Sequence, residues 1–416
     1  MQLNSAKSRS AFNSGRALAL QNSISNSRVL AIDAFRGITI LVMIFVNTLA
    51  GVRGMPAWMD HMPADVDGMT FPDVVFPAFL FIVGMSIPFA IAQRIAKGDV
   101  FLQLQKHIVM RALGLIVLGV FMVNAEEGYN EQAMHMSIYL WSLLFYGCAI
   151  LIWNVYRFEN KLLALALRLI GVVGLLILAW VFRGGPDGSV RLAPQWWGIL
   201  GLIGWAYLIA CIFYQLGKGR ILPLLAALAC CVLYYCIGHL DAIKDAPMLQ
   251  LLLSQSDDAS HTSIVLCGLI CSLIFFDENA KATARTRFLR AAGLAFCLLM
   301  VGYVLRPYFK ISKIYATPTW CLYSSAICIT IFAFLYWLVD LKAIRAWTAF
   351  FRPSASNPLL TYIIPYIVYA LMQYLHWSFP SIFQQGLPGL LWAAGYAVAV
   401  MALVIGLNRM NIRLQL

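Results

Sequence analysis

The 416 residues of this chain are 62% hydrophobic and only 12% charged, and the mean hydropathy is +0.79. Water-soluble domains carry about 25% charged residues, so this composition excludes a soluble fold. The net charge of +12 could suggest a nucleic-acid partner. However, the Lys and Arg residues form short clusters between apolar runs, a pattern typical of membrane topology, and no nucleic acid is expected.

The first 28 residues are rich in Ser, Asn and basic residues and contain no acidic residue. This composition fits either an organelle transit peptide or a cytosolic tail. We expect residues 1–28 to form a disordered cytosolic tail and residues 29–416 to form a single transmembrane domain.

Long apolar runs follow one another through the rest of the chain. A bilayer requires about 20 apolar residues per helix, and barrels show short alternating strands instead. The runs therefore predict an all-α, polytopic membrane bundle of ten to twelve helices. They lie near residues 30–50, 71–93, 107–124, 137–156, 162–181, 196–216, 220–239, 262–276, 289–308, 319–340, 357–376 and 387–407.

The loops differ in charge on the two sides of this predicted bundle. Most Lys and Arg residues fall on the side of the amino terminus, whereas the opposite loops carry acids such as Asp60, Asp65 and Asp67. The positive-inside rule places both termini in the cytosol. The loop between the first two helices then lies on the extracytosolic side.

Two charged residues open the first helix. Asp33 and Arg36 are spaced i, i+3 at its cytosolic end, so they can pair on one face. The pair either anchors the helix end or helps to bind a phosphate-bearing donor. The sequence leaves both interpretations open.

The loop after this helix contains His61, between Asn47 near the end of the first helix and Asp73 at the start of the second. Histidine can take a proton from an amine or hydroxyl at neutral pH. A carboxylate such as Asp73 could hold its other nitrogen, and Asn47 could orient an acyl carbonyl or an oxyanion. The alternative is that His61 is only a solvated or capping residue.

A second outer-side group consists of Lys313, Thr317 and Trp320. This group could bind a sugar or an anionic substrate, with Trp320 stacking on the sugar and Lys313 supplying charge. It could equally be an aromatic anchor at the membrane interface next to a helix-end lysine.

The stretch from Asp33 to Ser86 reads D-A-F-R-G, then F-V-N, a loop His, D-V-V-F-P and F-I-V-G-M-S. It resembles the signature of the heparan-α-glucosaminide N-acetyltransferase family and its bacterial members. The resemblance implies a membrane enzyme that acetylates an amino sugar on the far side of the membrane. It also implies that the family's catalytic histidine is His61, its asparagine Asn47 and its acidic residue Asp73.

The chain departs from the family in two places. The family's Gln-Arg pair after the third span is missing, because that region reads M-H-M-S-I-Y-L-W. The family's long luminal loop is represented only by residues 241–261. The identity of the acceptor is therefore left open.

Together these observations predict a multi-pass acyltransferase of the bacterial inner membrane, with His61 facing the periplasm. Acetyl-CoA is the expected co-substrate, and a sugar or glycan is the expected acceptor. The protein is expected to contact membrane lipid, and a homodimer is the candidate oligomer. No metal is expected. The main alternative is a secondary transporter or flippase for a glycan-related substrate, because twelve spans with both termini inside also fit that class. A structural subunit is the third alternative.

Overall fold

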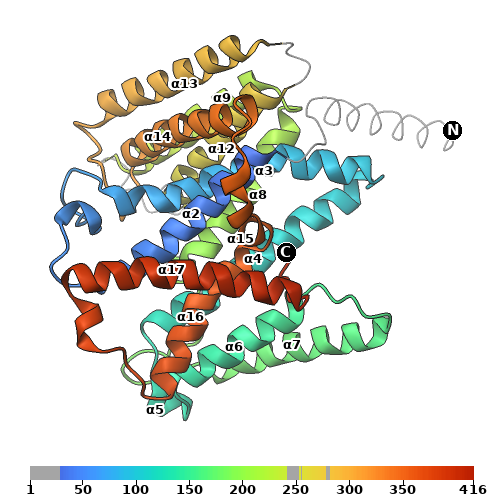
Figure 1. The fold of residues 1–416 in the computed structure, drawn as a ribbon, viewed down its shortest axis with the longest axis vertical. Helices are drawn as coiled ribbons and strands as arrows, with labels where there is room; N and C mark the ends of the chain where they lie inside the picture. The colour runs from blue at the N-terminus through green and yellow to red at the C-terminus, as the bar shows by residue number, and fades with distance from the viewer. Residues whose placement is uncertain (1–28, 241–252, 254, 278–281) are drawn as a thin grey trace. The chain divides into compact units, whose positions relative to one another are not determined.

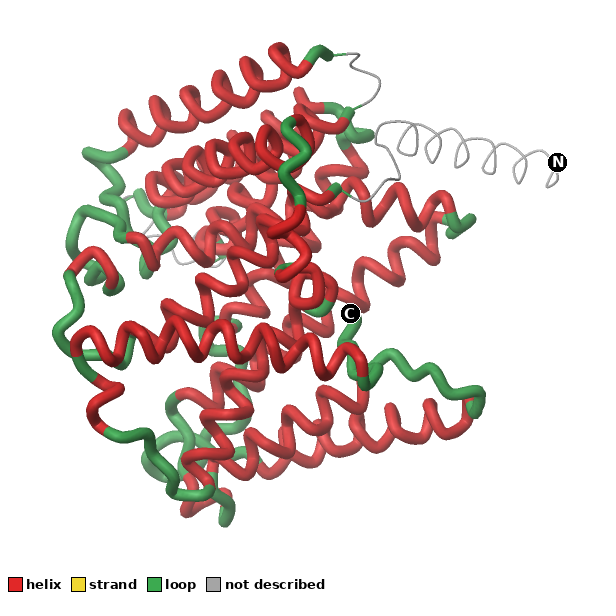
Figure 2. Tube along the Cα trace, in the orientation of Figure 1, coloured by secondary structure: helices red, strands yellow, loops and turns green. Residues whose placement is uncertain are grey.

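The computed structural model describes residues 29–240, 253, 255–277 and 282–416, so the predicted tail 1–28 lies outside the described residues. The described part consists of helices, turns and loops, with no β-strand (Figure 2). It divides into two compact units, each built from three segments. Among the described residues, the first comprises 29–35, His61–Ala112 and Ile203–Arg345, and the second Arg36–Asp60, Leu113–Leu202 and Ala346–Leu416. The single functional domain over 29–416 stays a prediction.

The first unit holds five complete long helices, and three further helices have residues in both units. The five are α3 (Val75–Ala96), α9 (Ile221–Gly238), α12 (Ser256–Phe276), α13 (Ala284–Leu305) and α14 (Pro318–Tyr336), with short helices η2 (Phe71–Val74) before α3 and η4 (Trp337–Leu341) after α14. The shared helices are α2 (Leu30–Leu49), α4 (Phe101–Glu126) and α8 (Gly198–Leu216).

The second unit contains the remaining helices. They are η1 (Ala57–Met59), α5 (Glu131–Met134), α6 (Ile138–Trp153), α7 (Lys161–Val181), η5 (Ala346–Phe350), α15 (Arg352–Ser356), α16 (Pro358–Tyr374), η6 (Ser381–Gln384) and α17 (Gly386–Arg409). Helices α6 and α7 form an antiparallel hairpin (Figure 1).

Ten helices of the described chain are long and apolar enough to cross a membrane. Helices α6, with 16 residues, and α16, with 17, are shorter and stand where two further spans were predicted. All twelve predicted apolar regions therefore contain a helix, and the predicted fold class is confirmed. The chain is a polytopic α-helical membrane protein.

Helix α12 forms the centre of the first unit. It packs against α3, α9, α13 and α14, and residues such as Val265, Cys267 and Ile270 have no exposed surface. A helix that is apolar on all sides needs neighbours on all sides. By contrast, α7 and α13 bury only a small part of their surface, which suits helices that face lipid.

Helices α3 and α12 come closest at two glycines. A Cβ atom added to Gly84 would fall on the Val265 carbonyl, and one added to Gly268 would fall on the Phe81 carbonyl. Small residues at such crossings allow helix backbones to touch in membranes. This contact holds α3, which directly follows the short helix η2 that carries Asp73, against the centre of the unit.

Gly84→Ala is expected to lower the thermal stability of the protein. The added methyl group must push α3 away from α12, and overpacking of this kind costs about 1–3 kcal/mol. The matched control is Gly293→Ala in α13, because a Cβ there meets no atom within 4 Å. Thermal unfolding of the two purified variants in detergent measures the difference. Equal unfolding temperatures would contradict the close contact.

Candidate functional site

Asp73 is held in one orientation at the start of α3. It lies in the short helix η2, and its side chain is only 1% exposed. Its Oδ2 accepts hydrogen bonds from the Thr70 backbone N–H at 3.0 Å, the Thr70 hydroxyl at 3.0 Å and the Met62 N–H at 3.2 Å. These donors offset the cost of burying a carboxylate and leave Oδ1 for another partner.

That partner is His61. The Nδ1 atom of His61 lies 2.7 Å from Asp73 Oδ1, and 36% of the His61 side chain is exposed. An ionised carboxylate only accepts hydrogen bonds, so we assign the imidazole proton to Nδ1. Nε2 then keeps its lone pair. The predicted contact between the two residues is present, whereas their catalytic role stays a prediction.

Lys313 approaches the same imidazole from a distant part of the chain. Its Nζ lies 3.2 Å from His61 Nδ1 and 3.4 Å from Nε2. Burial lowers the pKa of the Lys313 ammonium, and the charge of Asp73 opposes this shift. A positive group therefore lies beside both the histidine and the buried carboxylate.

Two loops carry these side chains, and hydrogen bonds tie the loops together. Asp67 Oδ1 accepts from the Ile311 N–H at 2.8 Å, and the Gly68 N–H donates to the Ile311 carbonyl at 3.1 Å. Arg306 forms an ion pair with Asp67 Oδ2 at 3.0 Å. The Ile311 N–H, followed by Arg306, lowers the pKa of Asp67. This tie holds the loop of His61 against the loop of Lys313.

Asp67→Ala is expected to weaken the hydrogen bonding between the two loops without changing His61 or Lys313. The Ile311 amide loses its acceptor, so its hydrogen exchange, and that of the neighbouring Gly68 amide, should speed up by about tenfold or more. Hydrogen exchange read by mass spectrometry over residues 61–70 and 306–317 measures the change. Asp187→Asn, in an exposed loop of the second unit, is the control. Unchanged exchange in Asp67→Ala would show that the loops are held by other contacts.

Thr317 and Trp320 lie at the start of α14 and contact the backbone next to Lys313 and of Asp73. Thr317 is the N-cap of α14, and its hydroxyl accepts from the Ser312 N–H at 3.0 Å. Trp320 has no exposed surface, and its Nε1 donates to the Asp73 carbonyl at 3.0 Å. The buried ring of His261 meets Trp320 edge-on, with ring centroids 6.2 Å apart. Trp320 therefore presents no open face for stacking on a sugar in this structure, and it positions Asp73.

The remaining predicted residues lie along α2. Asp33 is in its first turn and belongs to the first unit. Arg36 and Asn47 belong to the second unit, where Arg36 donates to the Ala355 carbonyl at 3.3 Å and Asn47 is exposed near the helix end. The structure describes each unit by itself. The roles of these three residues in binding a donor or an acyl group stay predictions.

Comparisons with known proteins bear on the chemistry of this site. The family model described as a domain of unknown function, DUF5009, matches residues 28–228, which include His61 and Asp73. Heparan-alpha-glucosaminide N-acetyltransferase of Mus musculus is 36% identical to this chain over 100 residues. Over this aligned part, the chain is similar to heparan-alpha-glucosaminide N-acetyltransferases. The enzyme of Homo sapiens is 35% identical over 97 residues.

The aligned regions cover 24% and 23% of this chain and 14% of each N-acetyltransferase. The chain thus matches a small part of the length of these relatives. The resemblance predicted from the motifs around His61 is confirmed. The activity and the substrates of the N-acetyltransferases are carried over to this chain only as proposals.

Several residues that shape the site were not predicted from the sequence. Thr70 and Asp73 form the [ST]-x-x-[DE] pattern of a capping box, which is readable from the sequence. The hydrogen bond between Asp67 and Ile311 could not be predicted from a local sequence motif, because these residues are 244 positions apart. Within the described ranges 29–240, 253, 255–277 and 282–416, no group of His, Cys, Asp and Glu is arranged to hold a metal ion.

Proposed function

We propose that this chain is a membrane-bound acyltransferase that moves an acetyl group from cytosolic acetyl-CoA to an amino sugar or glycan on the extracytosolic side. The observation that carries the proposal is the 2.7 Å contact between His61 and the buried Asp73 in a relative of N-acetyltransferases. We further propose the bacterial inner membrane as its location, with His61 facing the periplasm.

In this reaction His61 Nε2 acts as the general base. The acceptor nitrogen or hydroxyl oxygen attacks the carbonyl carbon of the acetyl thioester while Nε2 takes a proton from that atom. The carbon–sulfur bond then breaks, and the imidazolium returns the proton to the departing CoA thiolate. Asp73 holds Nδ1–H and stabilises the imidazolium by its negative charge.

Other residues have supporting roles in this proposal. Lys313 lies near enough to His61 to stabilise the oxyanion that forms on the acetyl group. Asn47 orients the acyl carbonyl, and Asp33 and Arg36 contribute to binding acetyl-CoA at the cytosolic end of α2. Thr317 and Trp320 shape the acceptor side through the loop of Lys313 and the backbone of Asp73.

The decisive experiment is acetyl transfer by the purified full chain. Labelled acetyl-CoA is incubated with a panel of amino sugars and glycans, and labelled product and free CoA are measured. The proposal expects both products in equal amounts. If the protein neither binds acetyl-CoA nor releases CoA, the acyltransferase is excluded and transport of a glycan-related substrate becomes the better explanation.

The same assay distinguishes direct attack from a route through acetyl-His61. In a direct transfer, CoA is released only when an acceptor is present. In a two-step transfer, the protein without acceptor releases one equivalent of CoA and retains the label on His61, which peptide mass spectrometry detects.

Lys313→Met is expected to lower kcat by about 10²–10³-fold, the usual loss when one oxyanion donor is removed. Methionine keeps most of the length of the side chain but removes the charge next to His61. The kinetic assay is repeated with Lys161→Met, a change at the start of α7 in the second unit, as the control. A normal kcat in Lys313→Met would exclude a role for this ammonium in the transition state.

A further inference from the structure

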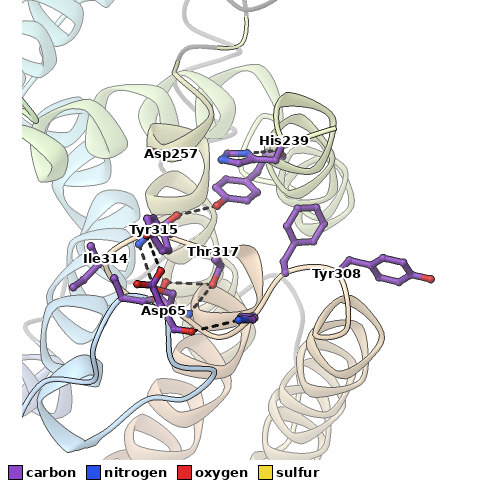
Figure 3. A pocket seen from close by; sticks show the side chains of 12 residues that line it. Asp65, His239, Asp257, Tyr308, Ile314, Tyr315 and Thr317 are labelled. Carbon is purple, nitrogen blue, oxygen red and sulfur yellow. Dashed lines mark hydrogen bonds between the residues drawn. The ribbon is translucent and has the colours of Figure 1, made fainter. Parts of the chain in front are cut away.

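A pocket of about 410 Å³ opens beside the loops of His61 and Lys313 (Figure 3). This volume falls in the range of about 300–1,000 Å³ that is usual for small-molecule sites. All of its walls belong to the first unit. The lining residues come from the loop after His61, the end of α9, the first turn of α12 and the segment before α14.

The pocket is lined in part by the two loops that carry His61 and Lys313. Ala64 and Asp65 follow His61 closely in the chain, and Ser312 and Ile314 flank Lys313. The Ser312 hydroxyl donates to the Ala64 carbonyl at 2.9 Å, which joins the two walls. A ligand in the pocket is therefore held by the same two loops that position His61.

The polar groups of the pocket include two carboxylates, Asp65 and Asp257, and one lysine, Lys310. The Tyr315 hydroxyl donates to Asp65 Oδ1 at 3.1 Å, and Lys310 Nζ reaches the Asp65 backbone carbonyl at 3.4 Å. The hydrogen bond to Asp65 raises the pKa of Tyr315. Carboxylate oxygens accept hydrogen bonds from hydroxyl and ammonium groups and repel other anions.

Aromatic rings form a large part of the remaining lining. The Tyr235 hydroxyl donates to the Tyr315 carbonyl at 2.9 Å, and the Tyr235 ring stacks on His239 with centroids 4.0 Å apart. Tyr315 is 52% exposed and Tyr308 is 79% exposed, and Figure 3 shows Tyr308 extending away from the cluster around Asp65. Tyr315 thus offers an exposed ring beside Asp65, and Tyr308 adds a second exposed ring to the lining.

Carboxylate acceptors next to exposed aromatic rings match a sugar ring, which presents hydroxyl donors at its edge and C–H groups on its face. We propose that this pocket binds the saccharide unit next to the one that is acetylated, and that it selects units without negative charge. The inference rests on the proposed function, because it takes the acetylated unit to lie at His61. It makes the pocket a specificity-determining subsite for extended acceptors.

The test compares two disaccharides that carry the same terminal glucosamine, one followed by glucosamine and the other by glucuronate. Equilibrium binding of each to the purified full chain is measured first, and transfer from acetyl-CoA second. The wild type is expected to bind the glucosamine disaccharide at least about tenfold more tightly, because a like charge placed against a carboxylate is costly. Equal binding, or a preference for the glucuronate disaccharide, would overturn the proposal.

Substitutions of pocket residues test whether the pocket causes the preference between the two disaccharides. Asp65→Asn and Asp257→Asn should each reduce the preference to about twofold while leaving kcat for free glucosamine unchanged. Tyr308 is 79% exposed, so Tyr308→Ala should leave the fold intact and weaken the binding of both disaccharides. Asp187→Asn, in the second unit, is the matched control and should retain the preference. A preference that survives in both aspartate variants would exclude this pocket.

Binding and transfer separate the two proposals. If the preference is present and is lost in the two aspartate variants but no acetyl group is transferred, the pocket assignment stands and the acetyltransferase fails. If acetyl transfer occurs without any preference, the acetyltransferase stands and the subsite is wrong.

Discussion

Replacing His61 with asparagine is expected to lower kcat/KM for acetyl transfer by about 10²–10⁴-fold, the usual contribution of a general base. The asparagine amide can still donate to Asp73 Oδ1, so the loop keeps its main hydrogen bond. It has no basic lone pair that could take a proton from the acceptor. The loss should therefore fall on the chemical step, and binding of acetyl-CoA should be unchanged.

Initial rates with saturating acetyl-CoA measure this loss, and thermal unfolding verifies that the variant is folded. The matched control is His376→Asn. His376 is exposed in the second unit and has a positive φ of 53°, a conformation that asparagine tolerates. The control should retain full activity. Wild-type turnover in His61→Asn would remove this histidine from the chemistry.

The helices were predictable because hydropathy and length decide whether a segment crosses a membrane. The predicted helix bounds differ from the observed ones where the end of a helix is polar. Helix α12 begins at Ser256, six residues before the predicted start at 262, because Asp257 and Asp258 lower the hydropathy of its first turns. These acids are favourable there, since a helix amino terminus attracts negative charge. Helix α4 likewise begins at Phe101, before the predicted 107, because Gln103, Gln105 and Lys106 lower the hydropathy of its first turns.

The contacts of the site were predictable only between residues that lie close together in the sequence. His61 and Asp73 are 12 residues apart, and their pairing follows from their places in one loop and the next helix start. Lys313 was predicted to bind substrate, but its contact with His61 spans 252 positions and depends on how the loops pack. Trp320 was predicted as an interfacial or stacking residue. Its burial against the Asp73 backbone depends on tertiary packing that periodicity cannot show.

Asp73→Asn should reveal whether the buried carboxylate acts through the histidine. The asparagine side chain can still accept from Thr70 through its oxygen, so η2 should form. Its amide nitrogen then faces His61 Nδ1, which must become an acceptor, and the proton moves to Nε2. An imidazole in that tautomer cannot take a proton at Nε2. We expect kcat to fall by about 10²–10⁴-fold, as a wrong tautomer does in a serine protease triad.

The tautomer provides a readout that loss of structure alone would not produce. Selective ¹⁵N labelling of histidine reports which ring nitrogen carries the proton. We expect Nδ1–H in the wild type and Nε2–H in Asp73→Asn, with equal unfolding temperatures. Asp187→Asn should leave the His61 resonances unchanged. If the His61 tautomer is the same in wild type and Asp73→Asn although activity is lost, then Asp73 acts by some means other than positioning the histidine.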